Sequence, residues 1–123
     1  MKDNSLVFLF WWVIFFTSVG FAQQQDTASW YSRTDANIHR FTASGEVFDD
    51  RKSTCASWDF PFGTYLKVTN LKNGKSVVCK VNDRGPAKHL RRHIDLTKTA
   101  FRQIADPRIG LAKVRVVPLG MRK

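Results

Sequence analysis

The 123-residue sequence has only two cysteines, only ten acidic residues and a single long apolar run. Two cysteines allow at most one disulfide. A chain of this length is enough for one domain and not for two. No internal repeat is present, and the only low-complexity stretch is a short glutamine-rich leader. The apolar run, residues 6–16, is short for a membrane span.

That apolar run belongs to an N-terminal segment with the layout of a secretory signal peptide. A short polar head precedes it, and Gly20 and Ala22 follow it in the spacing of a cleavage site. We therefore expect a signal peptide over residues 1–22 and a flexible leader over residues 23–26. The alternative, an uncleaved anchor, is favoured by two bulky tryptophans and by the single lysine of the head. The expectation is an exported protein, periplasmic or secreted, with no stable membrane insertion after signal removal.

No cysteine lies near the expected cleavage point, so the sequence predicts that the protein is not a lipoprotein. The 20 basic residues outnumber the acidic ones and give a net charge of +10. An exported domain this basic is attracted to anionic cell-wall polymers and lipid head groups. Export excludes nucleic acid as the partner. The charge also fits solubility alone, so it narrows the class of partner without naming a ligand.

Carboxylates gather at one place in this basic chain. Ser44-Gly45 marks a turn, and Glu46, Asp49 and Asp50 follow it directly. Two carboxylates three residues apart on a turn are typical of the acid pairs in glycan-cleaving sites. Surface acids are common, however, so the spacing also fits an ordinary solvated turn.

Two β-rich runs, residues 65–70 and 75–81, flank Asn73-Gly74, which is the strongest short signal for a hairpin. Whether the loop has two residues or four, the same side chains share the buried face of this hairpin. They are Leu66, Val68, Val77, Cys79 and Val81.

The second strand of this hairpin ends at Asn82-Asp83-Arg84, and Gly85-Pro86 forces the chain to turn. Asp83 falls on the same side as the buried positions at the point where the strand ends. A carboxylate beside a guanidinium is either the partner of Arg84 in a salt bridge or a catalytic acid. The local sequence leaves both interpretations open.

The two cysteines, Cys55 and Cys79, form a disulfide in an oxidising compartment or are two small buried hydrophobes, and the sequence leaves both open. Cys55 lies in a stretch, residues 51–58, that we expect to be a short helical or irregular link. His89 and His93 have a spacing that could bind a metal on a helix, but residues 88–92 are expected to be extended. No third ligand is evident, so no metal site is predicted.

The remaining patterns predict short strands at residues 27–31, 93–96 and 112–119. Thr97 is suited to cap a short helix, and Asp95 is expected to have a structural role at the entry of that helix. One short helix among several short strands indicates a small, mainly β barrel.

Several motifs in order and in register resemble the rare lipoprotein A family. They are Ala28-Ser29-Trp30-Tyr31, Thr42-Ala43-Ser44-Gly45-Glu46-Val47-Phe48-Asp49, Pro61-Phe62-Gly63-Thr64, Val68-Thr69-Asn70-Leu71 with Asn73-Gly74, Val81-Asn82-Asp83-Arg84-Gly85-Pro86 and Ile94-Asp95-Leu96. The resemblance implies a six-stranded double-psi β-barrel with one or two short helices, related in fold to expansins and barwin-type domains. It covers about residues 27–119, which places the domain at residues 27–120.

The resemblance further implies a monomeric, cofactor-free, endolytic lytic transglycosylase. Such an enzyme cuts peptidoglycan glycan strands stripped of stem peptides and leaves 1,6-anhydro-MurNAc ends, in cell-wall organisation and turnover. Carried over by position, the active-site acids are Asp83, as general acid/base, with Glu46 and Asp49 holding the sugar and stabilising positive charge. The implied substrate-binding residues are Ser57, Arg84, Asn82, Tyr31 and Thr42.

One position departs from the family pattern. Members usually carry a histidine four residues before the Pro-Phe-Gly turn, and here that position is Ser57. Serine can hydrogen-bond a sugar but cannot carry a proton at neutral pH as imidazole does. The sequence therefore also allows a substitute such as His39, or an expansin-like barrel that binds peptidoglycan without cutting it.

Overall fold

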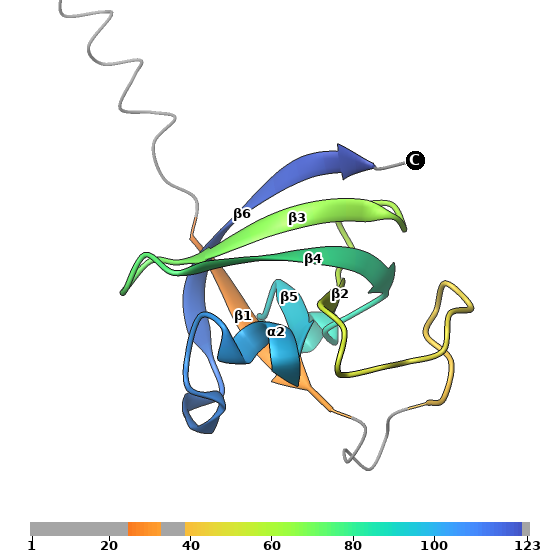
Figure 1. Cartoon of the computed structure of the whole chain (residues 1–123), viewed down its shortest axis with the longest axis horizontal. Helices are drawn as coiled ribbons and strands as arrows, with labels where there is room; N and C mark the ends of the chain where they lie inside the picture. The colour runs from red at the N-terminus through yellow and green to blue at the C-terminus, as the bar shows by residue number, and fades with distance from the viewer. Residues whose placement is uncertain (1–24, 33–38, 122–123) are drawn as a thin grey trace, which may run out of the picture.

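The protein is a closed six-stranded β-barrel (Figure 1). The computed structural model describes residues 25–32 and 39–121, so the expected signal peptide lies outside the described residues. The strands close in the order β1-β5-β2-β4-β3-β6. Their bounds are β1 Asp26–Tyr31, β2 Thr54–Ala56, β3 Thr64–Asn70, β4 Ser76–Asp83, β5 Ile94–Thr97 and β6 Ala112–Met121. This architecture confirms the predicted fold class.

The helical elements are short. They are the α-helix α2, Lys98–Arg102, and two 3₁₀ turns, η1 Lys88–Leu90 and η2 Pro107–Ile109. The side chain of Thr97 accepts a hydrogen bond from the N–H of Ala100, so the predicted N-cap is confirmed. Among the described residues, no helix has the length and apolar character needed to cross a membrane.

Two of the six strand pairs are parallel, and they bring distant segments of the chain together. β1 pairs with β5 and β2 pairs with β4 in parallel, and the other four pairs are antiparallel. Parallel neighbours require long connections. The segments 39–53, which precede β2, and 84–93, which join β4 to β5, both contribute residues to the candidate site.

The β3–β4 hairpin has the predicted register. Leu66 pairs with Cys79 and Val68 pairs with Val77, while Lys67 pairs with Val78 on the opposite face. The five side chains assigned to the buried face are all buried, and Lys67 and Val78 are exposed. Strand alternation alone was enough to predict this part of the core.

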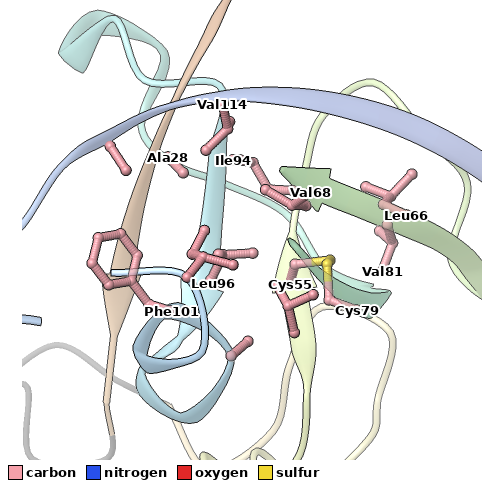
Figure 2. Close-up of a cluster of buried hydrophobic side chains, with 14 residues drawn as sticks. Ala28, Cys55, Leu66, Val68, Cys79, Val81, Ile94, Leu96, Phe101 and Val114 are labelled. Atoms are coloured by element: carbon pink, nitrogen blue, oxygen red, sulfur yellow. A yellow bond between two sulfur atoms is a disulfide. The ribbon is translucent and has the colours of Figure 1, made fainter. Parts of the chain in front are cut away.

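The core lies inside the barrel and is closed at one end by α2 (Figure 2). Phe101 and Ile104 are fully buried and pack with Leu96 and Val68. The side-chain amide of Asn70 donates a hydrogen bond of 2.8 Å to the carbonyl of Ile104. The helix end is therefore tied to the hairpin by a polar contact as well as by apolar packing.

Two segments differ from their predicted structure. The stretch expected to be a helical or irregular link contains β2, whose three residues are all buried between β4 and β5. A three-residue strand is too short to show a period, and its two neighbours stabilise it. Residues 88–90 form η1 instead of an extended segment, and Arg91, at a φ of 57°, ends the turn.

Cys55 and Cys79 form a disulfide between β2 and β4, with Cα atoms 5.8 Å apart (Figure 2). Both residues are almost completely buried in the core. The bond links the shortest strand to the central hairpin, and it restricts the unfolded chain by joining cysteines with a sequence separation of 24.

We expect the Cys55→Ala/Cys79→Ala double variant to lose about 2–4 kcal/mol of unfolding free energy, because its unfolded chain is no longer cross-linked. Urea denaturation with and without dithiothreitol measures the effect. Reductant should destabilise the wild type and leave the double variant unchanged. Equal stability of the wild type in both conditions would contradict the prediction.

Candidate active-site cleft

A cleft of about 540 Å³ lies on the outer surface of the barrel, where β1, β4 and β5 meet the loop of residues 39–48. Figure 1 shows this loop, in yellow, beside the arrowhead end of β4. The polar side chains that line the cleft come from four separate stretches of the chain. They are Tyr31, His39, Thr42, Asp83, Arg84 and Asp95.

The carboxyl group of Asp83 is held in a fixed orientation at the end of β4. Its Oδ1 accepts hydrogen bonds of 2.9 Å from the backbone N–H groups of Ala43 and Arg84. Within residues 25–32 and 39–121, Oδ2 has no hydrogen-bond partner. The carboxyl is therefore oriented through one oxygen, and the other is available to a ligand in the cleft.

Arg84 does not form a salt bridge with Asp83 in the part of the chain that the structure describes. Its Nη1 donates to the carbonyls of Ser57 and Phe60, at 2.8 and 2.9 Å. Its guanidinium lies 3.9 Å from the ring centroid of Phe62. The salt-bridge interpretation of the Asp83-Arg84 pair is therefore wrong, and Arg84 instead fixes the turn that follows β2.

Tyr31 connects the loop to the barrel. Its ring stacks on Phe48 at a centroid distance of 4.9 Å, and the two form a small buried cluster with Ala56. Its hydroxyl oxygen is buried and has no partner among the described residues. Burial, followed by the charges of Asp83 and Asp95, raises the pKa of Tyr31, so the hydroxyl stays protonated and can donate a hydrogen bond.

The prediction missed the position of Asp95. It lies between the core residues Ile94 and Leu96, so strand alternation turns it away from the core and toward the cleft. It accepts a hydrogen bond from the hydroxyl of Ser29, its partner on β1. The expected structural role at the helix entry is therefore incomplete, because Asp95 is a second carboxyl in the same cleft. The alternation of Ile94, Asp95 and Leu96 was the available signal.

The other two predicted acids line a separate cavity of about 310 Å³. Glu46 forms an ion pair of 2.9 Å with Lys80, and Asp49 forms one of 3.0 Å with Arg51. The hydrogen bond from Lys80 is the main cause of the lowered pKa of Glu46. Arg51 lowers the pKa of Asp49 to about 2. Both carboxyls are therefore ionised at neutral pH and are unsuited to donate a proton.

The remaining predicted residues lie in different places. Thr42 lines the cleft with Asp83, and Asn82 lines the second cavity with Glu46. Ser57 is buried, and its hydroxyl accepts the N–H of Asp59. Ser57 is not among the residues that line the cleft, whereas His39 is. Among the described residues, no three His, Cys, Asp or Glu side chains are grouped to bind a metal ion.

Solved structures share this fold. An apo expansin from Clavibacter michiganensis superimposes with a TM-score of 0.59 at 26% identity, over 80% of this chain and 51% of the expansin. The Streptomyces papain inhibitor gives a TM-score of 0.58 at 22% identity, over 76% of this chain and 94% of the inhibitor. The fold is thus a double-psi β-barrel.

Residues 23–116 match the family model described as lytic transglycolase, and the chain belongs to this family. A probable endolytic peptidoglycan transglycosylase RlpA from Nostoc is 45% identical over 78% of this chain and 26% of its own length. The endolytic peptidoglycan transglycosylase RlpA of Neisseria meningitidis is 42% identical over 76% of this chain and 38% of its own length. The matched region is thus a quarter to two-fifths of these relatives. The resemblance to rare lipoprotein A proteins is confirmed.

The ion pair of Glu46 leads to a prediction about its titration. Replacing Lys80 by methionine should raise the pKa of Glu46 toward its ordinary value, because the main hydrogen bond to the carboxylate is lost. The carboxyl carbon of Glu46, followed by NMR during a pH titration, reports this directly. Lys67→Met, on the exposed face of β3, is the matched control and should leave Glu46 unchanged.

The sign of the pH dependence follows from the direction of the shift. The folded-state pKa of Glu46 is below its unfolded value, so the pair stabilises the protein above the unfolded pKa. That contribution is lost as the pH falls through the folded pKa. An identical Glu46 titration in wild type and Lys80→Met would contradict the assignment.

Proposed function

We propose that the protein is an exported lytic transglycosylase that cleaves peptidoglycan glycan strands without stem peptides, in cell-wall organisation and turnover. One observation carries the proposal. In a chain of the lytic transglycolase family, a carboxyl group held by two backbone amides lines a cleft together with a second carboxyl and an imidazole. Catalysis of this kind needs an acid at a fixed position next to the bond that breaks.

Asp83 is the general acid/base. Its carboxyl gives a proton to the glycosidic oxygen between MurNAc and GlcNAc as the bond from the anomeric carbon to that oxygen breaks. The resulting carboxylate then takes the proton of the 6-hydroxyl of the same MurNAc, whose oxygen bonds to the anomeric carbon. The product is a 1,6-anhydro end, the acid is regenerated, and no water is consumed.

The other acids supply negative charge around the reacting sugar. Asp95, in the same cleft, faces the positive charge that develops at the anomeric carbon. Glu46 and Asp49, both kept ionised by basic partners, are assigned to hold the neighbouring part of the glycan with Asn82. A water-free product needs only one group that exchanges a proton, and the fixed orientation of the Asp83 carboxyl assigns that role to it.

The remaining polar groups of the cleft bind and orient the sugar. The unpartnered hydroxyl of Tyr31 is a donor, and Thr42 adds a second hydroxyl. Arg84 keeps the cleft in shape through its bonds to Ser57 and Phe60. Ser57, whose hydroxyl is engaged by Asp59, contributes through its carbonyl to Arg84 and not as a proton carrier. His39 is the imidazole of the cleft and takes the place of the usual family histidine.

Export is part of the proposal. A signal peptide over residues 1–22 and a short leader are expected to precede a domain that ends near residue 120, and this leader stops before Asp26, where β1 begins. The Cys55–Cys79 disulfide fits an oxidising compartment, periplasmic or extracellular. We expect the domain to act as a monomer, not lipidated and not inserted in the membrane.

A second candidate function is an expansin-like barrel that binds peptidoglycan without cutting it. Serine at position 57 favours it, because the usual family histidine is missing there. The curated relatives are named transglycosylases, and His39 lies in the cleft, so cleavage is the preferred function. The two functions differ in whether anhydro-ended products are released.

The Asp83→Asn variant should lose about 100- to 10,000-fold in turnover, because the amide cannot donate the proton. Anhydro-ended products released from denuded glycan strands measure the loss. The control is Asp106→Asn. Asp106 is paired with Arg108 and caps η2, and asparagine is an equally good cap. Unchanged turnover in Asp83→Asn would remove Asp83 as the acid.

The His39→Gln variant should lower turnover by at least about tenfold if imidazole acts in place of the missing family histidine. Its control is His93→Gln, because His93 accepts a hydrogen bond from Thr27 away from the cleft. The pH dependence of turnover should also change in His39→Gln and not in His93→Gln. Equal effects of the two substitutions would rule out a role for His39 in catalysis.

A further inference from the structure

The cavity next to the cleft has the features of a binding site of its own. It lies between the outer face of β2 and β4 and the acidic loop that precedes β2. Thr54 pairs with Lys80, and Asn82 is two residues farther along β4, so the three side chains share one face of the sheet. Glu46, Val47 and Asp49 cover them from the loop.

Two polar atoms in this cavity are buried and have no hydrogen-bond partner among the described residues. They are the Oδ1 of Asn82 and the Oγ1 of Thr54, in side chains of residues that are 3% and 7% exposed. Buried polar atoms in proteins nearly always have partners, because an unmade hydrogen bond costs free energy. Two such atoms lining one cavity indicate a ligand that supplies a donor and an acceptor.

The orientation of the Asn82 amide is fixed by its neighbour. The Asn82 side chain lies beside Glu46 in the cavity and contributes to the lowered pKa of that carboxyl. A carboxylate accepts and does not donate, so the amide nitrogen of Asn82 faces Glu46. The free atom is therefore the carbonyl oxygen, which needs an N–H or O–H donor. The hydroxyl of Thr54 can donate to an acceptor.

The charges of the cavity favour a neutral ligand. Glu46 is paired with Lys80, and Asp49 is paired with Arg51. With Lys52 and Lys80 the lining has two bases against two acids, so neither a cation nor an anion is favoured. In the part of the chain that the structure describes, no three His, Cys, Asp or Glu side chains are grouped around a possible metal ion. A neutral group with one N–H and one carbonyl oxygen, such as a secondary amide, meets both unpartnered atoms.

We propose that this cavity binds the 2-acetamido group of an amino sugar in the glycan that occupies the cleft. The N–H of the acetamido group donates to the Oδ1 of Asn82, its carbonyl accepts from the Oγ1 of Thr54, and its methyl group contacts Val47. The proposal rests on the proposed function, since it assigns this cavity to the sugar next to the one cut at Asp83.

The cavity and the cleft are close enough to share one glycan chain. The N–H of Ser44 donates to the carbonyl of Asn82, and the N–H of Ala43 donates to the carboxyl of Asp83. The same turn is therefore a boundary of both spaces. Asn82 lines the cavity and Asp83 lines the cleft, at the irregularity where the pairing of β4 with β2 shifts by one residue.

Thr54→Val is a clean test because the hydroxyl it removes makes no hydrogen bond within the described chain. Valine has nearly the shape of threonine and is a good strand residue. The variant should be as stable as the wild type or more stable, whereas loss of a structural hydroxyl would destabilise it. Thr54→Ser keeps the hydroxyl and serves as the conservative variant. Thr69→Val, on β3 away from the cavity, is the matched control.

The ligands are a hexamer of N-acetylglucosamine and cellohexaose, which has a hydroxyl group in place of each acetamido group. Binding is measured by titration calorimetry in the Asp83→Asn background, so that cleavage does not interfere. We expect the acetamido hexamer to bind at least about tenfold more tightly than cellohexaose, as one or two net hydrogen bonds allow. Thr54→Val should reduce this ratio about five- to tenfold, whereas Thr54→Ser and Thr69→Val should keep it.

The result separates this proposal from the proposed function. An acetamido preference that is lost only in Thr54→Val supports the cavity, even if the wild type releases no anhydro-ended products. The cavity assignment is overturned if the acetamido preference persists in Thr54→Val. It is also overturned if the protein that keeps Thr54 binds both hexamers equally or binds neither. In that case the two unpartnered atoms bind water only. Release of anhydro-ended products would then still support the transglycosylase.

Discussion

The site depends on one contact between segments far apart in the sequence, the docking of the turn at residues 42–46 on the end of β4. The N–H of Ala43 orients the carboxyl of Asp83, and the N–H of Ser44 bonds to the carbonyl of Asn82. Without this contact the carboxyl would lose one of the two N–H groups that orient it, and the turn would lose its link to β4. With it, one face of the barrel is divided into a cleft with a free carboxyl oxygen and a cavity with paired charges.

The barrel is a rigid scaffold, and the long connections between its strands carry side chains that line the cleft. The core, the disulfide and α2 hold the strands, while a separate cluster of Tyr31, Phe48 and Ala56 fastens the loop to the outside. Apolar burial therefore stabilises the barrel at one cluster and the position of the loop at the other. A substitution in the loop can alter the site and leave the core intact, which allows chains with this fold to differ in what they do with a polysaccharide.

The parts predicted from the sequence are those that local periodicity determines. Alternation identified the buried face of the β3–β4 hairpin, and Thr97 was recognised as a helix cap. β2 was missed because three residues carry no period and depend on neighbours brought from elsewhere in the chain. Local sequence patterns also could not predict that Asp83 and Glu46 line different spaces, because this depends on the side of the turn on which each carboxyl lies. The alternation of Ile94, Asp95 and Leu96 could have predicted that Asp95 faces away from the core, but the residue was assigned a structural role at the helix entry.

The covalent link between Asn82 and Asp83 has a consequence for how a polymer would be cut. The Cα atoms of adjacent residues are about 3.8 Å apart across a trans peptide, and no side-chain motion changes that spacing. Asn82, which would bind one sugar ring, and Asp83, which would cleave the glycosidic bond, would therefore be held a constant distance apart. Cleavage would then occur at a fixed register relative to the gripped ring, wherever along a strand the protein lands, with no further domain needed to measure the distance.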